Sequence, residues 1–168
     1  MASLSGVIES SCVIDAPIAQ VFAFHLDTRN AARIVPPGQR VLSVEGSFPL
    51  RAGGEVRLRV RQLPLPWAQT WLVRVAQIEE PTLIVDEMLR GPFALWRHEH
   101  RFAELPGGRT LLTDHVTYAL PGGLLGRVAD AALGRRLLLA SFRSREARAR
   151  TLIEAEVTAR TLPATFSQ

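Results

Sequence analysis

Residues 91–121 predict one long antiparallel hairpin, and this hairpin limits the possible folds more than any other feature. In both arms, apolar or aromatic residues alternate with polar ones. Successive side chains of a strand point to opposite faces, so one face of the hairpin is largely apolar. With the turn at residues 104–110, the facing pairs are Phe102 with Leu112, His100 with Asp114, His98 with Val116, and Trp96 with Tyr118. An apolar face with imidazole and carboxylate groups at its centre suits a cavity wall as well as a solid core.

Short strand patterns precede the hairpin. Alternating apolar and polar residues bounded by glycine or proline predict strands at residues 6–14, 40–45, 55–62, 67–79 and 82–89. Two short helices are predicted after the first strand, at residues 18–24 and 28–34. Asp15, followed by Pro17, is the expected N-cap of the first helix, and Asp27 is the expected N-cap of the second.

The last part of the chain predicts one long amphipathic helix, from about residue 124 to residue 162. Apolar residues recur there at helical spacing with arginines between them, and Gly134 is expected to bend the helix. Short turns join the strands, so we expect an antiparallel sheet with one face covered by this helix. The predicted fold class is α+β. We predict a single domain over residues 1–168, with its core at 5–160 and a frayed tail at 163–168.

This order of elements resembles the helix-grip fold of the START-like (SRPBCC) superfamily, and the residues resemble a bacterial branch often labelled cyclase/dehydrase-like. The resemblance extends from Ser5 to Arg150 and rests on Phe24-His25-Leu26-Asp27-Thr28, Arg40-Val41-Leu42, Gly91-Pro92-Phe93, Trp96-Arg97-His98-Glu99-His100, Thr113-Asp114-His115-Val116, Tyr118, Pro121 and Gly126. It implies a curved sheet of about seven strands under a long C-terminal helix. The superfamily contains both binding proteins and enzymes, so the resemblance indicates the fold rather than the chemistry.

Alternate connections of an up-and-down sheet lie at the same end. One end therefore gathers residues 35–38, 63–66, 90–92 and 120–123, which are rich in proline, glycine and aliphatic residues. We interpret this end as the mouth of a cavity between the sheet and the long helix, as the resemblance also implies. The predicted lining is mostly apolar with a few polar groups, as in known ligand sites. It consists of Val56, Leu58, Val60, Trp71, Val73, Trp96, His98, His100, Asp114, Val116 and Tyr118, closed by Leu138 and Phe142.

His98, His100 and Asp114 are the candidate catalytic residues. A carboxylate beside an imidazole orients one tautomer and favours the protonated form, which suits general acid–base work on a carbonyl substrate. The alternative, which we favour, is a buried hydrogen-bonded group that holds the two hairpin arms in register.

Glu87 is a further predicted cavity residue. Only one of Asp86 and Glu87 can point inward, and the apolar neighbours Val85 and Leu89 favour Glu87. The alternative for Glu87 is a salt bridge to an arginine.

No cofactor is predicted. The glycines form neither a phosphate-binding loop nor a dinucleotide fingerprint, and the chain has no lysine for a Schiff base. No metal is predicted either, because His115 alternates to the face opposite His98 and His100. Two histidines with Asp114 could bind a divalent ion, but without a third histidine and a matching motif this is only a minor alternative.

The charge pattern does not indicate a nucleic-acid partner. All 20 basic residues are arginines and the formal net charge is +4. The arginines of strand 55–62 lack interleaved aromatic residues for base stacking, and those of the long helix are interpreted as a solvated face.

No apolar run reaches the roughly 20 residues of a membrane span. The single Cys12 is predicted to be a packed, inert thiol in a reducing cytoplasm. The sequence leaves the oligomeric state open.

Three functions compete. The prediction is binding or transport of a hydrophobic small molecule (a lipid, isoprenoid or polyketide-like aromatic) in the internal cavity. The first alternative, implied by the resemblance, is a polyketide aromatase/cyclase-dehydratase that uses His98, His100 and Asp114. The second alternative is a protein-interaction module that uses the arginine-rich helix.

Overall fold

The computed structural model describes residues 5–161, in which the strands form one seven-stranded antiparallel sheet. The strands are β1 (Gly6–Ile14), β2 (Gln39–Glu45), β3 (Glu55–Gln62), β4 (Ala68–Glu79), β5 (Leu83–Arg90), β6 (Leu95–Leu105) and β7 (Arg109–Ala119). Their spatial order is β1-β7-β6-β5-β4-β3-β2, so β1 closes a meander by pairing with its last strand. The predicted helix-grip fold is confirmed. Of the ten predicted ends of β1 to β5, six are exact and four are displaced by one residue.

The predicted hairpin is formed by β6 and β7. All four predicted pairs are present, with His100 opposite Asp114 and His98 opposite Val116 at the centre. The turn is shorter than predicted because pairing continues to Leu105 and Arg109. Gly107 and Gly108 close it with φ angles of 83° and 69°, which glycine adopts without steric cost.

The short helices after β1 are α1 (Ile18–Leu26) and the 3₁₀ helix η1 (Thr28–Ala32). Asp27 caps η1 as predicted, because its side chain accepts a hydrogen bond from the backbone N–H of Arg29. The prediction for Asp15 is wrong. The backbone is still extended at Pro17 (ψ 143°), so Pro17 is the N-cap residue of α1. The backbone N–H of Asp15 instead donates to Glu154 of the C-terminal helix.

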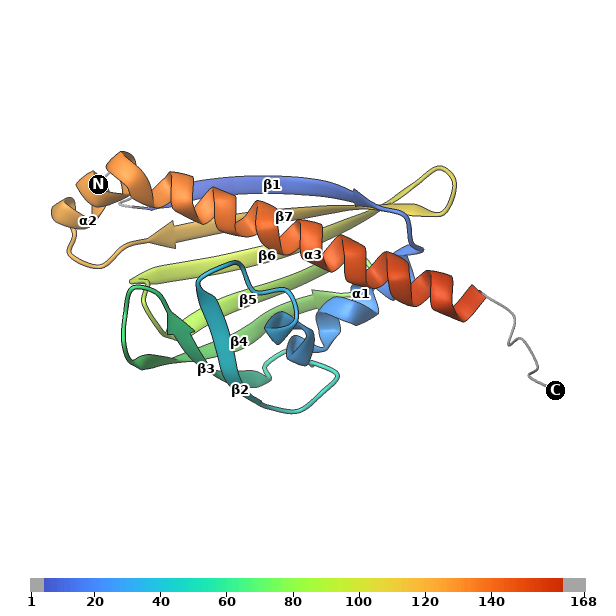
Figure 1. Ribbon diagram of the computed structural model, residues 1–168, viewed down its shortest axis with the longest axis horizontal. Helices are drawn as coiled ribbons and strands as arrows, with labels where there is room; N and C mark the ends of the chain where they lie inside the picture. The colour runs from blue at the N-terminus through green and yellow to red at the C-terminus, as the bar shows by residue number, and fades with distance from the viewer. Residues whose placement is uncertain (1–4, 162–168) are drawn as a thin grey trace.

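The C-terminal segment comprises α2 (Leu124–Ala129), a π-helical turn η2 (Asp130–Gly134) and α3 (Arg135–Thr161). Figure 1 shows α3 running obliquely across the sheet, over β1, β7 and β6. Gly134, at which a bend is expected, is the last residue of η2, a widened turn of the kind often found at functional sites. No helix among residues 5–161 is long and apolar enough to cross a membrane. The predicted tail at 163–168 lies outside the described residues.

Two apolar clusters lie between the sheet and the helices. The larger one joins α1, the C-terminal part of α3 and the sheet, and includes Phe22, Phe102 and Ile153. The smaller one lies near the start of α3 and consists of Ile8, Val116, Tyr118 and Phe142, with Phe93, Trp96 and Leu138 packed against it. The functional site described below lies beside both clusters.

Candidate functional site

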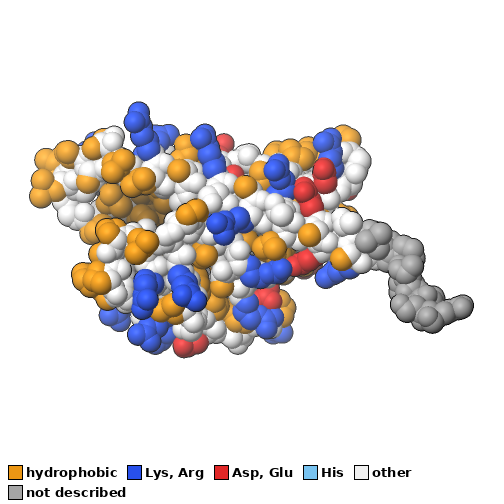
Figure 2. Space-filling model, viewed as in Figure 1, with side chains coloured by type: hydrophobic (Ala, Val, Ile, Leu, Met, Phe, Trp, Pro, Cys, Tyr) orange, Lys and Arg blue, Asp and Glu red, His pale blue; other side chains and the backbone are white. Residues whose placement is uncertain are grey.

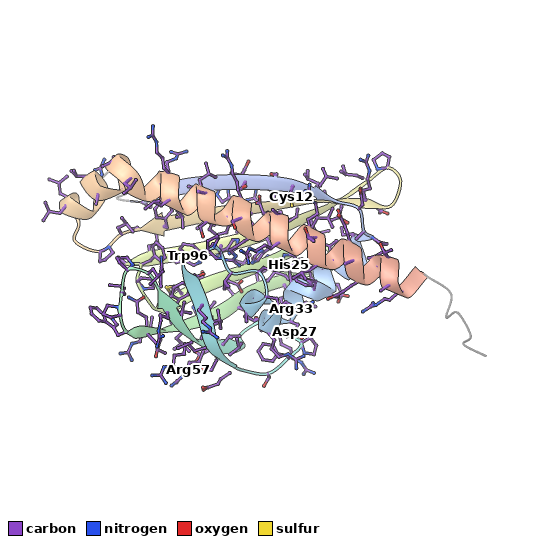
Figure 3. All side chains as sticks on the ribbon, viewed as in Figure 1. Cys12, His25, Asp27, Arg33, Arg57 and Trp96 are labelled. Carbon is purple, nitrogen blue, oxygen red and sulfur yellow. The ribbon has the colours of Figure 1, made fainter. Side chains whose placement is uncertain are left out.

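An inner chamber of about 110 Å³ lies between the sheet and the helical segments. Its wall is mainly aliphatic. On β3, Val56, Leu58 and Val60 face the chamber and are buried, whereas the arginines between them are exposed on the other face. The chamber is lined by Thr28, Ala31, Val35, Gln39, Val41, Leu50, Val56, Leu58, Val60, Trp71, Val73, Val75, Asp86, Met88, Trp96, His98, His100 and Arg145. Figure 3 shows Trp96 and His25 on the side of the sheet that α3 covers, with Arg57 away from that helix.

An outer chamber of about 250 Å³ adjoins the inner one. The two share the lining residues Gln39, Trp71, Met88, Trp96 and Arg145. Leu120, Phe93 and Gln62 also line the outer chamber, which places it at the end of the sheet where the sequence predicts the cavity mouth. Figure 2 shows a hollow at this end with apolar side chains around it. The inner chamber alone is below the roughly 300 Å³ typical of ligand pockets, so a ligand of ordinary size has to extend through both.

Most of the predicted lining residues border these chambers. Val56, Leu58, Val60, Trp71, Val73, Trp96, His98 and His100 line the inner chamber, and Leu138 and Phe142 line the outer one. Three predicted residues on β7 line neither chamber: Asp114, Val116 and Tyr118. They are buried behind the lining, because Phe142 and the two histidines cover the inner face of β7. Their predicted contact with the cavity is therefore wrong.

Tyr118 has a structural contact instead. Its hydroxyl donates a 2.7 Å hydrogen bond to Oδ1 of Asp130 in η2, and its burial, together with Asp130, raises the pKa of the phenol. The bond ties the end of β7 to the π-helical turn. We expect Tyr118→Phe to lower the free energy of unfolding by about 1.5 to 3 kcal/mol, the net contribution of a hydrogen bond to a charged group. Urea denaturation measures this loss, and ligand affinity should stay unchanged.

The prediction that Glu87 points inward is wrong. Glu87 lies on the outer face of the sheet and forms salt bridges to Arg74 and Arg97, of 3.1 and 3.0 Å. Its hydrogen bond from Arg74 is the main cause that lowers the pKa of its carboxyl. Asp86 points inward instead, because the pairing of β5 with β6 sets it opposite His98.

A carboxylate and imidazole cluster forms the polar part of the wall. Nε2 of His98 lies 2.9 Å from Oδ1 of Asp114, within hydrogen-bond distance. Nδ1 of His100 lies 2.7 Å from the same oxygen, close enough for an ion pair although poorly aligned for a hydrogen bond. Nε2 of His100 lies 3.4 Å from Oδ2 of Asp86. His100 is therefore held between two carboxylates, and Asp114 contacts both imidazoles.

The surroundings shift the pKa values of His100, His98 and Asp114 in different directions. Burial acts to lower the pKa of His100, but the charges of Asp114 and Asp86 outweigh it and raise the pKa to about 9. Burial and repulsion from His100 lower the pKa of His98 to about 4. Burial acts to raise the pKa of Asp114, yet the two histidines hold it well below its usual value. These shifts favour a cationic His100, a neutral His98 and an ionised Asp114 at neutral pH. Such a set can both donate and accept a proton at the cavity wall.

Among the residues that sequence reasoning missed, Arg145 and His25 carry titratable side chains and lie near the carboxylate and imidazole cluster. Arg145 of α3 lines both chambers, its guanidinium lies 5.3 Å from the centre of the Phe142 ring, and its burial lowers its pKa. It follows the predicted Phe142 by three positions, a spacing that places two residues on the same side of a helix. His25 of α1 packs its ring 5.3 Å from that of His100, and burial lowers its pKa to about 4. No periodicity indicates this contact, because the two residues are distant in the sequence.

Cys12 lies outside both chambers, on β1. Burial, with the nearby Glu146 and Asp114, raises the pKa of its thiol to about 12. The thiolate is the nucleophilic form of cysteine, so this geometry agrees with the prediction of an inert thiol.

Comparisons with known proteins agree with this architecture. A family model described as polyketide cyclase / dehydrase and lipid transport matches residues 14–139. A crystal structure of a protein from Thermus thermophilus is similar, with a TM-score of 0.72 and 17% identity, covering 90% of this chain and 99% of that chain. The Zhui aromatase/cyclase from a Streptomyces species has a TM-score of 0.69 and 20% identity, covering 97% and 99%. Norcoclaurine synthase from Thalictrum flavum has a TM-score of 0.66 and 8% identity, covering 89% and 93%. No curated protein matches the sequence. At these identities, the structural likeness shows the fold alone.

Proposed function

The chain belongs to the polyketide cyclase/dehydrase and lipid transport family, and from this premise we propose that it binds a hydrophobic small molecule between the sheet and α3. The observation that carries the proposal is the pair of adjoining chambers, which have a mainly aliphatic and aromatic wall and open at one end of the sheet. A solid core would leave no such space, since protein interiors normally contain few voids larger than a water molecule.

The shape and chemistry of the wall favour a flat or elongated ligand. The aliphatic side chains of β3 and β4 line the inner end, whereas Phe93, Trp96 and Phe142 line the passage outward. A lipid, an isoprenoid or a polyketide-like aromatic molecule would bury apolar surface along this path. Burial of apolar surface contributes about 25 cal/mol per Å², so the apolar wall is the main source of the expected affinity.

Polyketide cyclisation and dehydration is the second candidate function. The observation that favours it is the carboxylate and imidazole cluster, because His98 and His100 border the same chamber as the proposed ligand. A ligand carbonyl near these rings would have a proton donor and acceptor within reach. The fold likeness to an aromatase/cyclase supports the same interpretation. Turnover of a poly-β-ketone substrate that is lost in Asp114→Asn would favour this enzyme over a carrier.

Cavity filling tests the binding proposal. Val73 lines the inner chamber, and its larger replacement in Val73→Phe would occupy the space of the ligand. We expect the binding of cis-parinaric acid, an elongated fluorescent probe, to fall at least about tenfold, which corresponds to roughly 1.4 kcal/mol. Quenching of Trp71 and Trp96 fluorescence reports this binding directly, because both side chains line the cavity.

The matched control is Leu72→Phe. Leu72 is the preceding residue of β4 and pairs with Arg57, so its side chain lies on the outer face. It should retain the affinity of the native chain. Equal affinity in both variants would contradict binding inside the cavity. Native mass spectrometry of the purified protein would then identify any hydrophobic molecule that accompanies it.

A further inference from the structure

Three metal-ligating side chains converge on the inner chamber. One ligand atom each from Asp86, His98 and His100 lies within 4.8 Å of the others. The residues come from neighbouring strands: Asp86 of β5 is directly opposite His98 of β6, and His100 is two residues further along β6. All three border the cavity. Hydrophobic ligand binding requires none of them, so binding alone leaves this cluster unexplained.

Asp114 lies behind the two imidazoles and contacts both, as a carboxylate does when it supports metal-binding histidines without binding the metal itself. Its Oδ1 contacts Nε2 of His98 and Nδ1 of His100. The other nitrogens, Nδ1 of His98 and Nε2 of His100, are the ones a metal would take, and Nε2 of His100 already faces Asp86. A carboxylate behind a metal-binding imidazole fixes the ring and its tautomer, and makes the ring a stronger ligand.

The charges also fit a dication. Asp86 and Asp114 place two carboxylates next to His100, at 3.4 and 2.7 Å. A divalent ion would replace the proton of this cluster and, with two neutral imidazoles, balance both carboxylates. Arg145 lines the same chamber, so an anionic fourth ligand such as hydroxide would have a cation nearby.

We propose that Asp86, His98 and His100 bind one divalent transition-metal ion, with an open coordination position that faces the cavity. Imidazole and carboxylate ligands favour ions such as Zn²⁺ or Fe²⁺ over Ca²⁺ and Mg²⁺, which prefer oxygen ligands alone. Three protein ligands are the number found in catalytic zinc sites, where water or substrate takes the remaining position. A hydrophobic ligand that carries a carbonyl or hydroxyl oxygen could then reach the ion.

The test is a titration of the full chain with Zn²⁺ after treatment with EDTA and its removal. Isothermal calorimetry and native mass spectrometry should show one ion per chain. Asp86→Asn removes an inner ligand and Asp114→Asn an outer partner. Loss of an outer partner weakens metal affinity about 10- to 100-fold, and we expect a loss at least as large for Asp86→Asn.

Two control variants separate this site from adventitious binding. Glu87→Gln changes the next residue of β5, which lies on the outer face, and should retain the affinity. His115→Ala removes the imidazole that lies 3.2 Å from Glu9 on the exposed face, and should also retain it. The Zn²⁺ titration contains no hydrophobic probe, so failure of the proposed function would leave its result intact.

A measurement on the native chain avoids dependence on folding of the variants. Co²⁺ should shift the imidazole proton resonances of His98 and His100 and give the visible absorption of a nitrogen-ligated site. Shifts at His115 alone, retained affinity in Asp86→Asn, or the absence of saturable one-to-one binding would each overturn the proposal. The four residues would then be a hydrogen-bonded and ionic network without a metal.

Discussion

Asp114→Asn is expected to lower the free energy of unfolding by about 3 kcal/mol at neutral pH, because removal of one partner from a buried ionic group leaves the others uncompensated. Asp114 is almost fully buried and its Oδ1 contacts both His98 and His100. Asparagine keeps the shape of the side chain but removes its charge, so His100 would retain only Asp86 as a counter-charge. Urea denaturation in the presence of EDTA measures the loss without a contribution from bound metal.

Glu9→Gln is the matched control for this substitution. Glu9 faces His115 across β1 and β7, at 3.2 Å, but on the exposed side of the sheet. Exposed pairs contribute about 0 to 1 kcal/mol, so Glu9→Gln should change stability by much less than Asp114→Asn. Equal losses in the two variants would show that burial does not strengthen the Asp114 contacts.

The second expected result is a fall in stability between pH 7 and pH 9, of about 2 to 3 kcal/mol. The pKa of His100 is raised from 6.5 to about 9 in the folded chain. The folded state therefore holds this proton more tightly than the unfolded state. The resulting stabilisation is complete below pH 6.5 and is lost as the pH rises through 9.

Other shifted groups act mainly outside this interval. His25 and His98, with pKa values lowered to about 4, reduce stability as the pH falls from 6.5 toward 4. Burial raises the pKa of Glu146 from 4.5 to about 7, so this group lowers stability mainly as the pH rises from 4.5 to 7. Stability measured by urea denaturation in EDTA should therefore decline steadily above neutrality.

His100→Gln identifies the group responsible. This variant should show little decline between pH 7 and pH 9, whereas His115→Gln should decline as the native chain does. A native chain whose stability is constant over this interval would contradict the assignment of an imidazolium at His100.

The pairing of the central hairpin follows from local pattern. Alternation assigns His98 and His100 to one face, and the glycines at the turn bring Asp114 opposite His100, as the structure has it. The same logic failed for β5. Val85 is buried on the face opposite the cavity and Leu89 is exposed, so the apolar neighbours of Glu87 gave the wrong orientation. The pairing of β4 with β5 also contains register shifts, which the alternation of apolar and polar residues does not predict.

Arg145 and His25 illustrate a second limit. Each lies on a helix, and the rotation and position of a helix over a sheet depend on packing with residues far away in the chain. A helical repeat shows which residues share a face, but it does not show which strand that face meets. From the sequence, Arg145 is therefore indistinguishable from the other arginines of a solvated face, although it lines the cavity.

The amino-acid sequence by itself determined the order of elements, the α+β class, the hairpin register and most of the apolar lining, because these depend on periodicity between near neighbours. The tertiary structure alone decided that Asp86 rather than Glu87 faces the cavity, that Tyr118 and Asp114 lie behind its wall, and that Arg145 and His25 approach the histidines. These placements depend on register shifts, burial and helix docking. Contacts between distant segments set all three, and the spacing of residues in the sequence does not reveal such contacts.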